Sequence, residues 1–169
     1  MKRTIQLLAI LVFVASGHAF AQTLKFGHVN STQLLGLMPE TKNADSTLQK
    51  FGASLESQLK TMTNEYQAKV GEFRANEATM AEPIKEAKAK EINDLEQRIQ
   101  DFQDSAQQSL QKKKEEVYTP IIKKAEDAIK GIAKEKNYSY IFDTSVGVVL
   151  FAHESDDIMP LVKTKLGLK

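Results

Sequence analysis

The sequence predicts an α+β, mostly helical fold, in which a long antiparallel helical hairpin resembling a coiled coil forms an arm on a small β-containing body. Residues 40–119 are charged and rich in Gln, Glu, Lys and Ala, and Gly71 and Pro83 are their only helix-breaking residues beyond position 52. Such a segment favours long helices over loops. The flanking residues 22–39 and 120–169 are apolar and rich in strand-favouring residues, so we assign them to the body.

The first 21 residues have the pattern of a cleavable signal peptide. Lys2 and Arg3 precede an apolar stretch from Ile5 to Ala15, and the small residues Ala19 and Ala21 form a peptidase site. An apolar stretch this short does not cross a bilayer, which takes about 20 residues. We therefore expect export, cleavage after Ala21 and no stable insertion in the membrane.

Charge and cysteine content exclude several classes of protein. Loss of Lys2 and Arg3 with the leader reduces the 23 basic residues to 21, against 22 acidic ones. This balance gives no basic footprint for nucleic acid. The absence of cysteine excludes disulfides, cysteine-ligated metals and thiol nucleophiles. No nucleophile elbow, phosphate loop or zinc-protease motif is present, so the sequence predicts neither an enzyme nor a cofactor.

Apolar residues recur at helical spacing in both halves of the arm and predict where two helices meet. When the halves are folded back on each other, the residue numbers of facing pairs add up to 165, as for Phe73 with Ile92. The predicted seam consists of Leu48, Leu55, Leu59, Met62, Tyr66, Val70, Phe73, Ile92, Leu95, Ile99, Phe102, Leu110 and Val117.

The same pairing predicts the turn of the hairpin. Its centre falls between Glu82 and Pro83, and Pro83 suits the first residue of the returning helix, where no backbone donor is needed. Each arm helix of roughly 40 residues is then about 60 Å long at 1.5 Å per residue.

The body is expected to begin with a strand and a short helix. Leu24–Asn30 is β-prone, and Ser31 is a candidate N-cap for a helix that runs through Leu37 and stops before Pro39. After the arm, helix is expected to continue as far as residues 134–136, and Asn137 follows it.

Two further strands and a terminal helix are expected in the C-terminal part. Residues 138–143 alternate in a strand pattern, and Val146–Ala152 forms a second β-prone run. Asp156 and Asp157 stand at the first turn of an amphipathic helix, where negative charge suits the helix dipole.

Three strands are few for one chain, and the run Val146–Ala152 carries apolar residues on both faces. A small sheet of this kind needs cover from elsewhere, so we expect several chains to pool their strands. The candidates for this shared core are Phe26, Val29, Ile141, Phe142, Val148 and Leu150.

Two histidines remain after the leader, His28 and His153, each near the end of an expected strand. Only Glu154 and Asp156 lie near them at a spacing that suits metal ligands, so we predict no metal site. A metal-binding or small-ligand module using these two histidines is kept as an alternative hypothesis.

Several stretches resemble the Skp/OmpH family of periplasmic chaperones. They are Leu24–Asn30, Met38–Lys42, Thr119–Tyr138, Ile141–Asp143 and Asp157-Ile158, which occur in the family's order. The resemblance implies a homotrimer whose pooled strands form a small barrel, with three helical hairpins around a cavity. It also implies a holdase in the periplasm that keeps unfolded outer-membrane proteins from aggregating without ATP.

The arm differs from the family's best-known members, which are markedly basic, because residues 40–119 carry 12 basic and 15 acidic residues. Most large apolar side chains of the arm are used in the seam, so contacts with a client protein are expected to be weak and dispersed. The candidates for such contacts are Met80, Ile84, Ala75, Ala78 and Ala87. The alternative from another class is a structural or adaptor coiled-coil protein of the cell envelope.

Overall fold

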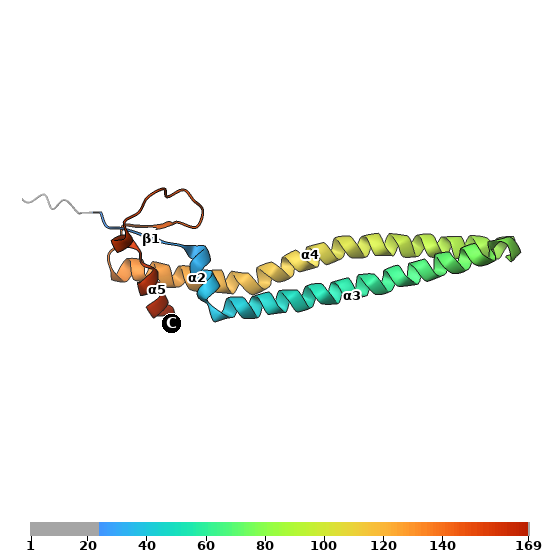
Figure 1. The fold of residues 1–169 in the computed structure, drawn as a ribbon, viewed down its shortest axis with the longest axis horizontal. Helices are drawn as coiled ribbons and strands as arrows, with labels where there is room; N and C mark the ends of the chain where they lie inside the picture. The colour runs from blue at the N-terminus through green and yellow to red at the C-terminus, as the bar shows by residue number, and fades with distance from the viewer. Residues whose placement is uncertain (1–23, 169) are drawn as a thin grey trace, which may run out of the picture.

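The computed structural model describes residues 24–168, and two long helices make up most of it (Figure 1). The proposed signal peptide, 1–21, lies outside the described residues. The elements in chain order are β1 (Phe26–Val29), α2 (Ser31–Leu37), α3 (Pro39–Asn76), η1 (Glu77–Thr79), α4 (Glu82–Glu135), β2 (Tyr140–Asp143), η2 (Glu154–Asp156) and α5 (Met159–Leu166). The mostly helical character with a small sheet is as predicted.

Helices α3 and α4 lie side by side along the arm and run in opposite directions (Figure 1). At 38 residues, α3 is about 57 Å long. Helix α4, with 54 residues, continues past the start of α3 and becomes the central helix of the body. Helix α4 thus runs without a break from the arm into the body.

The turn at the arm tip begins earlier than the sequence suggested. Helix α3 ends at Asn76, and a short 3₁₀ turn and two further residues lead to Glu82, which opens α4. Glu82 and Pro83 therefore lie in the first turn of the returning helix rather than at the centre of the connection. Proline is tolerated there because the first helical residues have no intrahelical acceptor for their N–H groups.

The sheet consists of β1 and β2, which are parallel and in register from Phe26 opposite Tyr140 to Val29 opposite Asp143. Parallel pairing requires a crossover connection, and the whole arm serves as that connection. On the side of β1 away from β2, the N–H of Ile158 donates to the carbonyl of His28 at 2.9 Å. The segment before α5 thereby covers part of that edge.

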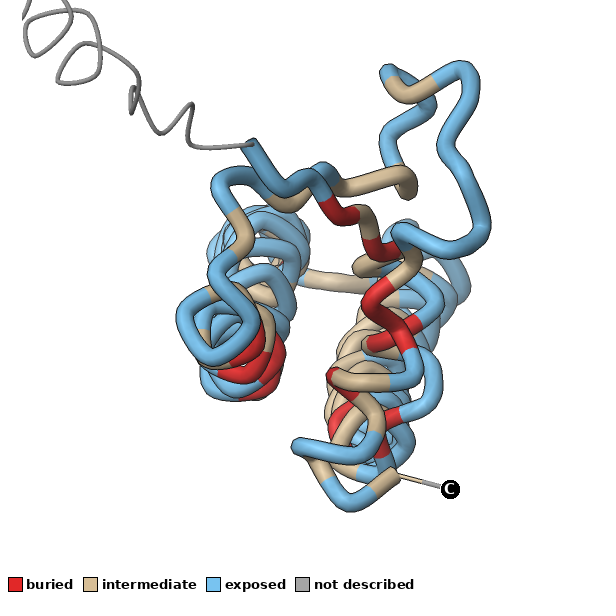
Figure 2. Tube along the Cα trace, turned by 90° about the vertical axis from the view of Figure 1, so that its left-hand side faces the viewer, coloured by how far each residue is buried: buried red, intermediate tan, exposed pale blue. Residues whose placement is uncertain are grey.

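The core lies where α2, α5 and the inward side of the sheet meet the C-terminal part of α4 (Figure 2). Its fully buried large side chains are Leu34, Met38, Ile158, Val29 and Val162. By contrast, Ala44 and Leu95 are the buried residues of the arm among the described residues. The body is the compact part of the chain, and the arm is thinly packed.

Local sequence explains how the body elements begin and end. The side chain of Asn30 accepts a hydrogen bond from the N–H of Gln33 and caps α2, so Asn30 and not Ser31 is the N-cap. Asn137 has a positive φ of 53° just after α4, a conformation that asparagine tolerates better than most residues. Gly167 takes the same region at the end of α5, where its N–H donates to Thr164.

The expected strand Val146–Ala152 is not formed in this chain. These residues make a loop that projects from the body between β2 and η2, visible as the dark orange loop in Figure 1. A strand needs a neighbour to accept and donate its backbone hydrogen bonds, and no segment among residues 24–168 pairs with this one in a sheet. The prediction of a strand here was therefore wrong for the isolated chain.

Candidate functional site

The predicted seam residues differ in how deeply they are covered. Leu95 is 2% exposed, whereas most of the others are partly buried between α3 and α4. Leu110 is 39% exposed and contributes little to the seam. The arm is held by a narrow strip of apolar contact, as two helices without a third layer must be.

Two ion pairs join α3 to α4 near the tip. The Nζ of Lys69 lies 2.5 Å from the Oε1 of Glu91, and the Nζ of Lys88 lies 2.8 Å from the Oε1 of Glu72. The hydrogen bond from each lysine lowers the pKa of its glutamate partner below the ordinary value. Both pairs are solvent-accessible, so they fix the helix register more than they add stability.

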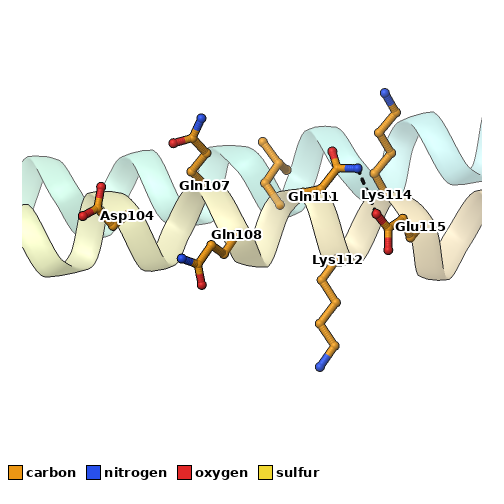
Figure 3. Close-up of a pocket in the computed structure, with 8 residues that line it drawn as sticks. Asp104, Gln107, Gln108, Gln111, Lys112, Lys114 and Glu115 are labelled. Atoms are coloured by element: carbon orange, nitrogen blue, oxygen red, sulfur yellow. Dashed lines mark hydrogen bonds between the residues drawn. The ribbon is translucent and has the colours of Figure 1, made fainter.

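The side chains around Leu110 form an open polar hollow of about 780 Å³ on α4. The residues that line it are Asp104, Gln107, Gln108, Leu110, Gln111, Lys112, Lys114 and Glu115 (Figure 3). Gln111 donates to Glu115 at 3.0 Å, while its neighbours project away from one another. Because every lining residue comes from one helix, this surface does not enclose a ligand.

The arm tip exposes little apolar surface. Ile84 is 51% exposed and Met80 is partly buried. The other client-contact candidates, Ala75, Ala78 and Ala87, are all exposed and small. The structure leaves these five side chains accessible but does not gather them into one groove.

The outward side of the sheet carries three aromatic rings, which we call the aromatic face: Phe26, Tyr140 and Phe142. Their ring centroids are 5.9 to 6.4 Å apart. Each ring is about half exposed. Stacked aromatic rings that face water on one side of a two-stranded sheet indicate a contact surface.

The loop 146–151, which we call the apolar loop, lies beside the aromatic face. Val148 is 75% exposed and Leu150 is 97% exposed. Together with Phe26 and Phe142, the loop lines a hollow of about 790 Å³. The core candidates thus divide: Val29 is buried, Ile141 is partly buried, and the other four are exposed within the single chain.

Asp143 lies at the end of β2 and ties the start of the apolar loop to α2. Its carboxylate accepts hydrogen bonds from the N–H and hydroxyl of Ser31 and from the N–H of Ser145. Burial raises the pKa of Asp143, but these hydrogen bonds outweigh it and lower the pKa to about 2. The side chain is therefore ionised and fixed at neutral pH.

The histidine pair is brought together, but in a way that does not suit a metal. The Nε2–H of His28 donates to the backbone carbonyl of His153 at 3.0 Å, so that nitrogen is occupied. Within residues 24–168, no cluster of three or more His, Cys, Asp or Glu side chains is placed to hold a metal ion.

No helix among the described residues combines the length and the apolar character that a bilayer crossing requires.

The architecture is that of a long helical hairpin on a small body of helices and a two-stranded sheet, with an aromatic face exposed on that sheet. The family described as outer membrane protein (OmpH-like) matches residues 25–166, and the chain belongs to this family. The resemblance drawn from the sequence is confirmed, and membership supports a chaperone role.

A solved structure from Caulobacter crescentus CB15, described as an OmpH-like outer membrane chaperone, has the same fold with a TM-score of 0.73. The two chains are 16% identical, and the match covers 89% of this chain and 88% of that one. The search of curated proteins found no match. At this low identity, the two proteins share the backbone fold but few side chains.

Several body residues escaped prediction from the sequence. Leu34, Met38 and Ile158 are at most 1% exposed, yet none was named as a core residue. The spacing from Leu34 to Met38, one helical turn, was the available signal. Met38 lies just past Leu37, where the helix was expected to stop before Pro39, so the sequence did not mark it as a buried position.

Proposed function

We propose that the mature protein is an ATP-independent holdase of the periplasm that binds unfolded outer-membrane proteins and prevents their aggregation. The observation that carries the proposal is membership in the OmpH-like family over nearly the whole chain. The signal-peptide pattern of residues 1–21 supports export. No stable insertion in the membrane and no nucleic-acid partner belong to the proposal.

The proposed mechanism is enclosure with many weak contacts. The seam uses most apolar side chains of the arm, and Ile84 is the large apolar residue left accessible near the tip. Several weak contacts add through effective concentration when arms surround one client, and each releases easily. A holdase that must return its client unfolded benefits from such release.

The active particle is proposed to be a homotrimer with pooled strands. Support comes from the aromatic face and the apolar loop, which leave Tyr140 58% and Leu150 97% exposed in one chain. Apolar patches of this kind on a small sheet are stable only when covered. In the assembled body, the apolar loop of each chain would find the strand neighbour that it lacks alone.

The test is dilution of an outer-membrane barrel from urea into buffer without nucleotide, with light scattering as the measurement. We expect the purified protein to suppress scattering at about one trimer per client. Leu95→Asp and Phe73→Asp place a charge in the seam, melt the arm and abolish suppression. Asn93→Asp adds the same charge at an exposed position of α4 and is expected to leave suppression intact.

Retained suppression in both seam variants, with arm helicity lost by circular dichroism, would overturn the holdase mechanism. A folded wild-type protein that leaves scattering unchanged would instead favour the adaptor coiled coil. An adaptor is expected to bind one folded envelope partner at fixed stoichiometry and to ignore unfolded chains.

A further inference from the structure

His28 lies on the same side of the sheet as the aromatic face. Side chains alternate along a strand, so His28 points to the same side of β1 as Phe26. Its partner across the sheet is Phe142, which carries one of the three aromatic rings. The side chain of His28 is partly buried, whereas Phe26 and Phe142 are exposed. A titratable ring therefore adjoins a surface that is otherwise aromatic.

His28 also holds the far end of the apolar loop. Its Nε2–H donates to the backbone carbonyl of His153 at 3.0 Å. The near end of the loop is held by Asp143, whose carboxylate accepts the N–H of Ser145. The loop is thus attached to the sheet at both ends, to the end of β2 and to β1. These two contacts set where the loop leaves and rejoins the body.

The hollow of about 790 Å³ beside the aromatic face places His28 among apolar side chains. Phe26, Phe142 and residues 148–151 line this hollow together with His28. While the hollow is open, water solvates any charge on the histidine ring. When a second copy covers the hollow, as the proposed homotrimer requires, a charged ring loses that water and its charge becomes costly.

The titratable groups around His28 come from β2 and from the segment before α5. Asp156 and His153 line the same hollow. Asp157 pairs with His28 in a single bridge, but its carboxylate accepts the N–H of Met159. The full set is Tyr140, Asp143, His153, Glu154, Asp156 and Asp157. Among residues 24–168, none of these carboxylates forms an ion pair with His28. A covered imidazolium at position 28 would therefore lack a direct counter-ion.

We propose that His28 makes self-association of the body sensitive to pH, with the neutral ring favouring the assembly and the protonated ring favouring the single chain. The neutral ring carries its hydrogen on Nε2, because a carbonyl only accepts, so the incoming proton goes to Nδ1. The contact with His153 survives, since Nε2 donates in both forms. What changes is the charge that a second copy must cover.

This inference rests on the proposed homotrimer and adds a regulation to it. Histidine gains its proton between about pH 8 and about pH 5, the range in which a mild acidification takes place. Acid would thus loosen the assembly around a client without unfolding the chain.

Sedimentation velocity of the mature chain, 22–169, at about pH 7.5 and about pH 5.5 tests the proposal. Each proton that association excludes lowers the association constant by up to about tenfold per pH unit. We expect the constant of the wild type to fall at least roughly tenfold between the two conditions. His28→Gln keeps an N–H for the carbonyl of His153 and carries no charge, so its association should be the same at both pH values.

The matched control is His153→Gln, because His153 contacts His28 through its backbone and is itself exposed. In the mature chain these two residues are the only histidines, so the two variants separate their contributions. The control should lose association in acid as the wild type does.

A second measurement does not depend on a variant of His28. Nuclear magnetic resonance of the histidine rings reports their protonation, and His153→Gln assigns the two signals. The ring of His28 should take up its proton at a lower pH in concentrated, associated protein than in dilute protein. This comparison decides the question if His28→Gln fails to associate at about pH 7.5.

Three results would overturn the proposal. They are wild-type association that does not change with pH, a pH dependence that persists in His28→Gln, and proton uptake by His28 at the same pH in dilute and concentrated protein. A wild type that is associated at both pH values leaves the homotrimer standing without a pH switch. A wild type that is monomeric at both pH values removes the homotrimer and the switch with it.

Discussion

At the scale of single residues, Asp143 connects three segments that are far apart in the sequence. Its carboxylate binds Ser31 at the start of α2 and Ser145 at the start of the apolar loop, and it ends β2 itself. The loop thus leaves the body from a fixed point although its tip is exposed. A charged acceptor shared by several donors is stronger than neutral hydrogen bonds of the same geometry.

Asp143→Asn should therefore reduce stability in a pH-dependent way. The pKa of Asp143 falls from its ordinary 3.8 to about 2 on folding, so its contribution is present above pH 4 and is lost as the pH falls toward 2. We expect a contribution of about 1 kcal/mol, discounted because the side chain is only partly buried. Urea unfolding at fixed protein concentration, from pH 6 down to about pH 2, measures this contribution to the free energy of unfolding.

The control is Asp94→Asn on the arm, since Asp94 is exposed and makes no side-chain hydrogen bond or ion pair among the described residues. If both variants lost the pH dependence of the free energy of unfolding equally, this dependence could not be assigned to Asp143.

Gly27 offers a second test at this scale, because a side chain there has no space. A Cβ at position 27 would lie 2.9 Å from the ring of Tyr138 and 3.0 Å from the Cγ2 of Ile158. Gly27→Ala should cost about 1 to 3 kcal/mol through overpacking. Gly52→Ala in α3 meets no atom within 4 Å and should stabilise by roughly 0.5 to 1 kcal/mol. Thermal unfolding measures the change in stability of both variants. A higher unfolding temperature for Gly27→Ala as well as for Gly52→Ala would exclude the clash at position 27.

At the scale of elements, the arm is two helices joined by a strip of apolar contact and fixed in register by ion pairs. Leu95 is nearly fully buried, while its neighbours along the seam are covered only in part. The Lys69–Glu91 pair lies in the same part of the arm. Stability is therefore concentrated around Leu95 rather than spread evenly along the arm.

Leu95→Ala should destabilise the arm by about 2 to 4 kcal/mol, whereas Leu110→Ala should cost less than about 1 kcal/mol because Leu110 is already 39% exposed. Hydrogen exchange of the arm amides, read by mass spectrometry, measures the difference. The exchange of the body amides is the internal control. If the two substitutions accelerated hydrogen exchange of the arm amides equally, the stability of the seam would not be centred on Leu95.

At the scale of the whole molecule, the helical part of the fold was accessible from the sequence because local signals dominate it. Apolar spacing and the lack of glycine and proline predicted the long helices. The pairing of the seam residues placed the turn centre between Glu82 and Pro83, with Pro83 as the first residue of the returning helix, and the structure has Pro83 in the first turn of α4. The connection at 77–81 carries no glycine or proline of its own, so its position left no clear signal.

The body was harder to predict because its residues are buried by partners distant in sequence. Ile158 is covered by residues of elements far from it in the sequence, which no local pattern records. The apolar loop read as a strand because its composition is that of a strand, whereas backbone pairing depends on a neighbour that a single chain does not supply. That other copies of the chain supply this neighbour stays a prediction.

The prediction that other copies cover the aromatic face and the apolar loop can be tested by measuring self-association. Phe142→Ser and Leu150→Ser each remove an apolar side chain that is exposed in the single chain, by 47% and 97%. If other copies cover these residues, each change costs about 2 kcal/mol per chain and lowers the association constant by more than roughly tenfold. Sedimentation velocity over a concentration series measures the shift toward monomer.

Ile84→Ser is the matched control, because Ile84 is 51% exposed at the arm tip, far from the body along α4. It should leave the association unchanged. The helix content of all three variants should stay near that of the wild type, because none of these side chains is buried within one chain. Unchanged sedimentation in both body variants would mean that the aromatic face and the apolar loop meet something other than a second copy. An unfolded client would then be the remaining candidate for that surface.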